Sequence, residues 1–275
     1  MISRRSAVVG LGAGLVSGGA VVGAPGTMRV AVIGGPPPKI FNQLSIAAAG
    51  PSESKLDGVL IAGRAEGDAK RYLEAGVPVW IDGPLAASVS EASDLIAAAA
   101  RAKTALMAAT GQEFLPSTSF LRRRAAEVAP LSAAMLAVSA TERTGVEAVN
   151  LACAIFGPTA AKVSRIVTSA KEPNYTIALE YHHDRPWQVV AQGTPSTACR
   201  AWVHFYGTDH SELMDDALHA AIAMLEMFRT RKAPQDPAHL LAKTKLYLAA
   251  CRSTDWGEGR PFAVGDLDEN WRLHA

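Results

Sequence analysis

The chain has 275 residues with balanced charge, 27 basic against 26 acidic, so it offers no basic surface for nucleic acid and no acidic tail. Apolar residues make up 49% of it, enough for one large or two modest domains with real cores. The cysteines Cys153, Cys199 and Cys251 are odd in number and far apart, which excludes a disulfide framework and a cysteine metal cluster.

Residues 1–24 have the pattern of an export signal. Arg4 and Arg5 precede a mild, glycine-rich apolar run, and Val22-Gly23-Ala24 is a small-residue cleavage site. Twin arginines before a weakly hydrophobic run are typical of Tat export. We therefore expect a periplasmic or extracellular protein.

The segment allows two other interpretations. Gly10, Gly12 and Gly14 have the spacing of a dinucleotide fingerprint, but the strand expected at Arg29–Ile33 follows too soon for a crossover helix. An uncleaved apolar anchor is the second alternative. No later stretch is long and apolar enough to span a bilayer, so we expect no membrane association once the signal is removed.

The first buried strand is expected at Met28–Ile33, and Gly34 and Gly35 begin the turn after it. Such a strand and glycine turn are typical of a dinucleotide-binding domain. Pro36–Pro38 follow, however, and proline has no N–H to offer a pyrophosphate. Nicotinamide binding at this turn is therefore expected to be weak or absent.

The next segment predicts a shortened domain. Lys39–Gly50 is expected to form one helix, and Asp57–Gly63 the following strand. The interval leaves room for one crossover helix and no additional strand. Glu53 lies in a Pro/Ser loop and Asp57 opens the strand, so neither resembles a ribose ligand. A helix is expected at Asp68–Ala75.

A strand, a tight turn and a helix come next. Val77–Ile81 alternates apolar residues, and Ser88 and Glu91 have capping-box spacing before a helix that runs to Lys103. Ligands bind in open α/β sheets where such strands end. The turn that would lie in this crevice consists of Asp82, Gly83 and Pro84.

This turn resembles the E-K-P-(L/V)-A signature of the Gfo/Idh/MocA family, the relatives of glucose–fructose oxidoreductase and inositol dehydrogenase. The resemblance implies a Rossmann-like domain, NAD or NADP as cofactor and a sugar-like substrate. It makes Asp82 a candidate catalytic acid. In the family the signature lysine lies near the nicotinamide, and this chain has Gly83 there. The candidate cofactor-binding residues are Gly34, Gly35, Gly83 and Pro84.

Ala105–Ala109 is expected to be the next strand, followed by Phe120–Arg124. In the family an arginine after this strand often faces the substrate, and Arg122 is the nearest match. The alternative is that all three arginines are solvated at the start of a helix.

A second stretch of resemblance begins the C-terminal domain, after a strand at Leu136–Ala140. Family members read H-x-x-(D/E) at the start of a helix, and this chain has Thr144 and Glu147 in that frame. A threonine hydroxyl such as that of Thr144 does not gain or lose a proton near neutral pH, so it cannot act as a general acid or base. Glu147 is either a catalytic acid or a helix N-terminal carboxylate favoured by the macrodipole.

Four segments then alternate like strands, which predicts a mostly antiparallel sheet. They are Val163–Ser169, Thr176–Tyr181, Trp187–Gln192 and Ala198–Gly207. The resemblance implies an open-faced sheet that lines the substrate cleft and pairs two subunits. Apolar residues that exceed the need of one face support a homo-oligomer: Tyr181, Trp187, Val189, Trp202 and Phe205. His182-His183-Asp184 is explained by a hairpin tip, and we expect no metal site.

Two helices are expected at the end of the chain. Asp209 and Glu212 form a capping pair for a long helix that reaches Phe228. Asp236 and Pro237 are the N-cap and first residue of a final helix.

The sequence thus predicts an α/β protein with a shortened Rossmann-like parallel sheet domain, residues 28–128, and an α+β domain with an open, mostly antiparallel sheet, residues 129–275. One hypothesis is an exported sugar or cyclitol oxidoreductase that uses Asp82 and Glu147. The other is a non-catalytic relative that uses its cleft or its C-terminal sheet for binding or assembly. Gly83 and Thr144 stand where the family has its lysine and histidine, so the sequence favours a protein that is weakly active or inactive.

Overall fold

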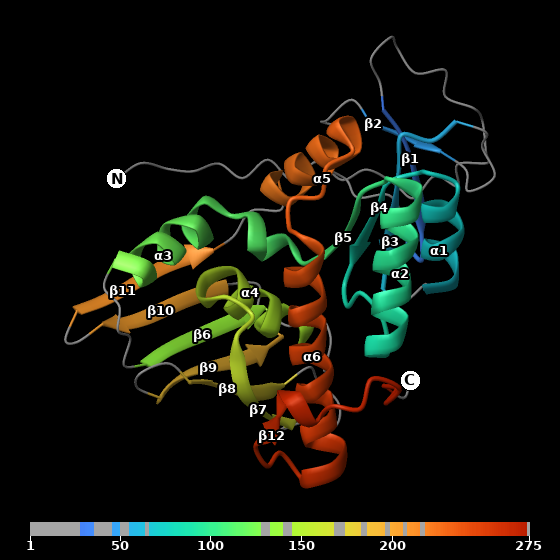
Figure 1. Ribbon diagram of the computed structural model, residues 1–275. Coiled ribbons are helices and arrows are strands. Elements are labelled where there is room, and N and C mark those ends of the chain that lie inside the picture. The colour runs from blue at the N-terminus through green and yellow to red at the C-terminus, as the bar shows by residue number, and fades with distance from the viewer. Residues whose placement is uncertain are drawn as a thin grey trace, which may run out of the picture.

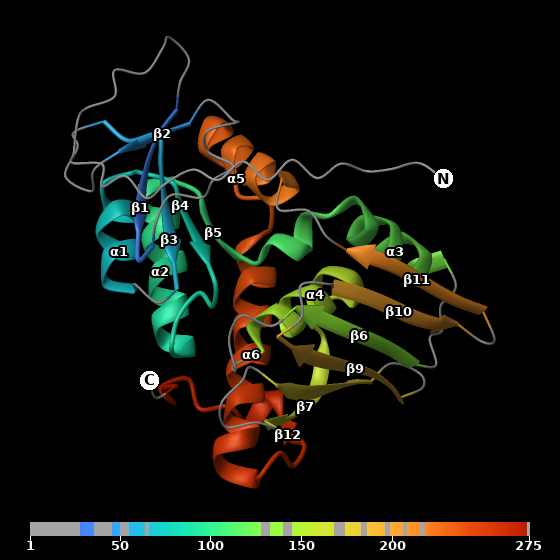
Figure 2. The same cartoon turned by 180° about the vertical axis from the view of Figure 1, so that it is seen from behind.

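The computed structural model describes residues 28–35, 46–49, 55–63, 66–127, 133–139, 145–167, 174–182, 186–195, 199–205, 208–214 and 218–273. They form two sheets, and helix α6 (Pro237–Gly257) runs between them in both views (Figures 1 and 2). No helix in these ranges combines the length and the apolar character needed to cross a membrane.

The first sheet consists of five parallel strands in the order β2-β1-β3-β4-β5. The strands are β1 (Met28–Ile33), β2 (Ile46–Ala49), β3 (Gly58–Ala62), β4 (Val79–Asp82) and β5 (Leu106–Ala109). Parallel sheets are buried on both faces, which explains the continuous apolar runs of β3 and β5. The strand order reverses between β1 and β3, and this switch point is where doubly wound sheets bind ligands.

Both faces of the first sheet are covered by helices. Ile61 and Ile81 pack against α1 (Glu66–Glu74) and α2 (Val89–Ala102) on one face. Helix α5 (Leu218–Thr230) covers the other face, where its Met224, Met227 and Phe228 cluster with Trp80 and Met107. A segment from the C-terminal half therefore completes the core of the first sheet (Figure 1).

Helix α2 begins where the capping pattern predicts. The Ser88 hydroxyl accepts a hydrogen bond from the Glu91 N–H at 3.1 Å, and the Glu91 carboxylate accepts one from the Ala87 N–H at 3.3 Å. These bonds satisfy two of the amides that a helix start leaves unpaired. They also fix the turn after β4, which positions the crevice residues.

The second sheet is mixed, in the order β11-β10-β6-β9-β8-β7-β12. Strands β6 and β9 are parallel, and the other neighbours are antiparallel, as predicted. The strands are β6 (Ala133–Ser139), β7 (Ala160–Val167), β8 (Tyr175–His182), β9 (Pro186–Thr194), β10 (Cys199–Phe205), β11 (Thr208–Met214) and β12 (Phe262–Ala263).

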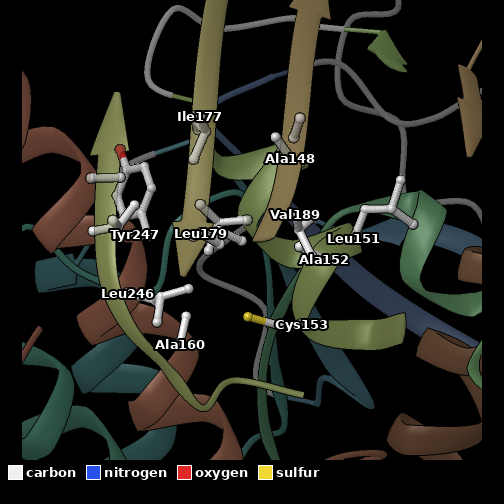
Figure 3. Close-up of a cluster of buried hydrophobic side chains, with 14 of the residues drawn as sticks. Ala148, Leu151, Ala152, Cys153, Ala160, Ile177, Leu179, Val189, Leu246 and Tyr247 are labelled. Atoms are coloured by element: carbon white, nitrogen blue, oxygen red, sulfur yellow. The ribbon is translucent and has the colours of Figure 1, made fainter. Parts of the chain in front are cut away.

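One face of this sheet packs on α4 (Val146–Phe156) and α6, forming the largest hydrophobic core. Figure 3 shows Ala148 and Ala152 of α4 beside Val189 of β9, with Leu179 of β8 and Leu246 of α6 on the other side of Val189. The alternating burial along β8 follows from this arrangement, because successive side chains of a strand point to opposite faces.

The helix predicted over Lys39–Gly50 is wrong in its C-terminal part. Residues Ile46–Ala49 form β2, which pairs in parallel with β1, and residues 39–45 lie outside the described ranges. Alanine favours helices locally, but hydrogen bonding to an open sheet edge overrides a weak propensity. The interval after β1 therefore does hold an additional strand.

The helix predicted from Asp209 is also wrong at its start. Thr208–Met214 is strand β11, paired antiparallel with β10 from Phe205 opposite Thr208, and α5 begins only at Leu218. The Asp209–Glu212 spacing fits a capping box, but that pattern is local and the adjacent strand competes with it.

Two of the residues that supported an oligomer, Tyr181 and Val189, lie in the core and not on the open face. Tyr181 and Val189 are fully buried in the core, and Trp187 stacks on Tyr181 with ring centroids 4.4 Å apart. The side chains of Trp202 and Phe205 lie outside the described part of the structure. The open face instead exposes Met135, 61% accessible on β6.

Candidate functional site

Three glycines meet where β1, β3 and β4 end. Gly34 has φ +83°, and a Cβ there would run into the carbonyl oxygen of Ala62. The Gly63 N–H donates to the Asp82 carbonyl at 3.1 Å. Gly83 has φ +142°, and a Cβ built on it would lie 3.8 Å from the Gly63 Cα. The strand ends thus converge with bare backbone at the switch point, as a ligand crevice requires.

The turn after β4 also borders a small cavity between the two sheets. Gly83 and Pro84 form one wall, Val146 and Asn150 of α4 a second, and Lys243 of α6 a third. Its volume is about 10 Å³, room for one water molecule. The Asn150 Nδ2 is buried and has no hydrogen-bond partner within the described residues.

The sequence-predicted site residues are only partly brought together. Asp82 is exposed at the end of β4, beside Gly83 and Pro84. Gly35 is exposed after β1. Arg122 is exposed on α3 (Pro116–Glu127). Thr144 lies outside the described residues.

Glu147 is buried at the start of α4, 4% exposed. Its Oε2 accepts a hydrogen bond from the Tyr175 hydroxyl of β8 at 3.4 Å. The residues of α4 that border the cavity are Val146 and Asn150, one turn apart on a different face of the helix. The Glu147 carboxylate is therefore directed to the sheet, and this position fits a structural acid at a helix N-terminus.

A buried ion pair links the two halves of the molecule below the crevice. Glu113 of η2 (Gly111–Phe114) and Lys243 of α6 are 2.7 Å apart, with side chains 1% and 3% exposed. The Glu113 carboxylate also accepts from the Thr110 N–H at 2.9 Å and from Gln235 Nε2 at 2.9 Å. These three donors thus compensate for the hydration that the Glu113 carboxylate loses on burial.

The ionisable groups around this pair are shifted by burial. The pKa of His239, one turn before Lys243, is lowered by burial and then by the Lys243 charge. Burial raises the pKa of the Cys153 thiol to about 12, with Lys243 lowering it and Glu113 raising it by smaller amounts. Both groups are therefore neutral near pH 7.

Sequence reasoning missed Glu113, Lys243 and Asn150. The sequence did contain an indication for Lys243. It lies three residues after Leu240 and four before Tyr247, so it falls on the same buried face of α6 as these two residues. A lysine at such a position has to be paired when buried. Its partner could not be identified, because Glu113 is 130 positions away in the chain.

The buried cysteines give a direct check of this environment. Cys153 and Cys251 are at most 1% exposed. In a Cys199→Ser variant we expect no thiol to react with Ellman's reagent at pH 8 in the folded state, and two to react in guanidinium. With a pKa near 12, the thiolate fraction of Cys153 at that pH is only ~10⁻⁴. Rapid reaction of a thiol in the folded protein would contradict this.

The arrangement offers little acid–base chemistry at the turn after β4. Gly83 contributes no side chain, and the nearby Lys243 ammonium is held by Glu113. Within the described ranges, no three His, Cys, Asp or Glu side chains are grouped to hold a metal ion.

Solved structures with the same fold were found across most of the chain. GenD2 from gentamicin A biosynthesis, in complex with NAD, is 14% identical, with a TM-score of 0.67 over 91% of this chain and 99% of that one. A myo-inositol dehydrogenase from Corynebacterium glutamicum is 10% identical, with a TM-score of 0.61 over 86% and 98%. An oxidoreductase from Agrobacterium radiobacter, in complex with NAD+, L-tartaric acid and magnesium, is 13% identical, with a TM-score of 0.61 over 87% and 99%.

No protein-family model matches the sequence, and no curated protein matches it. At these identities the structural likeness establishes the fold. It confirms the predicted architecture of a Rossmann-like domain followed by a mostly antiparallel sheet domain.

Proposed function

We propose that the chain is a Gfo/Idh/MocA-type protein that keeps the dinucleotide-binding fold but has lost most or all of its hydride-transfer activity toward a sugar or cyclitol. The observation that carries the proposal is Gly83 at the end of β4. It occupies the crevice turn next to Gly63 and provides no amine for proton transfer.

The fold supports NAD or NADP as the cofactor class, since two neighbours of the same fold are complexes with NAD. In this chain Gly34 and Gly83 bring backbone without side chains to the crevice turn, and Gly35 and Pro84 follow them directly in the chain. The residues that follow, Pro36–Pro38, have no N–H groups for the pyrophosphate. The glycines suit the close approach of a nicotinamide dinucleotide to the backbone, but the loop after them would hold its phosphates weakly.

Bound nicotinamide would supply hydride chemistry, and the chain would have to move the accompanying proton. Thr144 has no suitable pKa for this role. Glu147 is hydrogen-bonded to Tyr175 in the core. Asp82 remains as the acid nearest to the crevice turn, and the exposed Arg122 on α3 as a group that would attract an acidic substrate. With Gly83 and Thr144 in place of the family's lysine and histidine, Asp82 alone supports weak activity at most.

The first experiment is inexpensive. The chain without residues 1–24 is purified from cells, and the native protein is analysed for a bound nicotinamide nucleotide by mass spectrometry. We expect none to be retained. A stoichiometric nucleotide in the purified protein would contradict the proposal.

A second role, assembly through the open face of the second sheet, is supported by an apolar row across it. Met135 is opposite Val190 in the strand register, and Val190 is opposite Ala178. Met135 is 61% exposed in the single chain, and a second copy would bury this surface. The chain would then form a homo-oligomer.

We expect Met135→Glu to shift the protein to a monomer, because an interface across this face would bury an unpaired carboxylate from each copy. Light scattering coupled to size-exclusion chromatography measures this. Lys70→Glu, an exposed change on α1, is the control and should leave the mass unchanged. A wild-type protein that is monomeric at high micromolar concentration would exclude assembly through this face.

Export is the third part of the proposal. It is supported by Arg4 and Arg5 before the apolar run of residues 7–22. Replacing both arginines by lysine is expected to abolish appearance of the protein in the periplasmic fraction. Unchanged export would leave a Sec signal or an anchor as the explanation.

A further inference from the structure

We propose a second ligand site, separate from the crevice, that binds a neutral polyhydroxylated compound such as a saccharide. It is a pocket of about 500 Å³ at the far end of α6, a typical volume for a small-molecule site. Its walls come from α6, β12, η3 (Val264–Asp266) and the turn that follows them. Its lining includes Arg252, Phe262, Asp266, Asp268, Asn270 and Trp271.

The pocket is distinct from the crevice. Arg252 follows Lys243 on the same helix by nine positions, which places it about 14 Å further along the axis at 1.5 Å per residue. The two cavities have no lining residue in common. The inference is therefore independent of nicotinamide binding and of activity in the crevice.

Backbone hydrogen bonds hold the wall that contains Trp271 in place. The Leu273 N–H donates to the Ala87 carbonyl at 2.9 Å, and the Ser90 N–H donates to the Glu269 carbonyl at 2.9 Å. These bonds attach the C-terminal segment to the start of α2. Within the turn, the Trp271 N–H donates to the Asp268 carbonyl at 3.0 Å. A pocket with such a wall is pre-formed, and binding costs little ordering of the chain.

The wall chemistry selects a ligand that has both an apolar face and hydroxyl groups. The rings of Phe262 and Trp271 are partly buried against the main core; Phe262 contributes apolar surface, and the Trp271 ring is partly covered by the Arg252 guanidinium. The exposed carboxylates of Asp266 and Asp268 accept hydrogen bonds, and the Asn270 amide both donates and accepts. A saccharide ring presents this combination of C–H faces and hydroxyls.

Charge argues against anionic ligands, and the Arg252 side chain argues against a cation stacked on Trp271. Two carboxylates, Asp266 and Asp268, oppose one guanidinium, Arg252, so an anion would be repelled. The Arg252 guanidinium lies 5.5 Å from the centroid of the Trp271 ring, where a cationic ligand would otherwise bind. A neutral ligand meets neither obstacle.

The test uses the chain without residues 1–24, with no nicotinamide added. Saturation-transfer NMR and calorimetry are carried out with glucose, galactose, mannose, N-acetylglucosamine and cellobiose, and with choline and glucuronate as cationic and anionic comparisons. We expect at least one of the neutral sugars to bind at millimolar concentration, and choline and glucuronate not to bind.

Two variants locate the binding. Trp271→Ala should abolish it, and Asp266→Asn, an exposed change that leaves the core intact, should weaken it about tenfold, since a charge-assisted hydrogen bond becomes a neutral one. Lys70→Glu is the control and should bind as the wild type does. The proposal is overturned if no sugar binds at tens of millimolar, if an ionic compound binds in preference, or if affinity is the same in Asp266→Asn.

Discussion

Replacing Lys243 by methionine is expected to lower the free energy of unfolding by about 3–5 kcal/mol. The substitution leaves the Glu113 carboxylate, 1% exposed, without its charge partner below the crevice. Truncating one member of a buried pair costs more than the pair contributes, because the remaining charge stays out of water. Chemical denaturation measures the loss, and the melting temperature should fall by roughly 6–20 °C for a chain of this size.

Two controls show whether the charge is responsible. Lys245→Met, two positions further on α6, removes an exposed pair with Glu269 at 3.7 Å and should cost at most ~1 kcal/mol. The double variant Lys243→Met with Glu113→Gln should recover part of the stability, because no buried charge is then left alone. A loss below ~1 kcal/mol in Lys243→Met alone would mean that water reaches the pair.

Restoring an amine at the crevice turn is expected not to restore dehydrogenase activity. A general acid or base contributes ~10²–10⁴-fold to rate, so the absence of two such groups places turnover of sugars and cyclitols below detection. Gly83→Lys replaces one of them, but φ +142° is a backbone conformation that L side chains rarely adopt. Thr144 still cannot accept a proton, and groups that act together do not contribute additively.

Formation of NADH or NADPH with a sugar and cyclitol panel measures this. Gly83→Ala is the matched control, since it carries the same backbone strain without the amine. Turnover in Gly83→Lys that is absent in Gly83→Ala would show that the lysine is the main missing component. The other losses in the chain would then be of little consequence.

Local patterns in the sequence located many elements correctly. The alternating run Met28–Ile33 is β1 with the same bounds. The Ser88 cap begins α2, and Asp236 caps α6 by accepting from the His239 N–H at 2.7 Å. In each case the physical cause lies within a few residues, namely a buried face or a satisfied helix amide.

The failures occurred where distant parts of the chain decide the structure. Ile46–Ala49 is a strand because β1 offers a free edge, and Thr208–Met214 is a strand because β10 does. Helix propensity and a capping pattern predicted helices there, since neither contains information about strand partners.

The candidate site was also predictable only where its cause is local in the sequence. The position of Gly83 at the end of a parallel strand followed from a strand–turn–helix pattern of about twenty residues. The Glu113–Lys243 pair and the unpartnered Asn150 amide depend on how η2, α4 and α6 meet. The sequence contains no local indication of that junction beyond a lysine in an apolar stripe.

Calorimetric titration of the chain lacking residues 1–24 with NAD and with NADP is the most direct measurement. If the crevice has lost its phosphate ligands and its amine, both titrations should give no heat of binding at micromolar concentrations, with affinity at best in the millimolar range. Micromolar affinity for either nucleotide would show that backbone groups other than those of Pro36–Pro38 hold the phosphates. Combined with turnover of any sugar or cyclitol, it would establish an active dehydrogenase and contradict the proposed loss of hydride transfer.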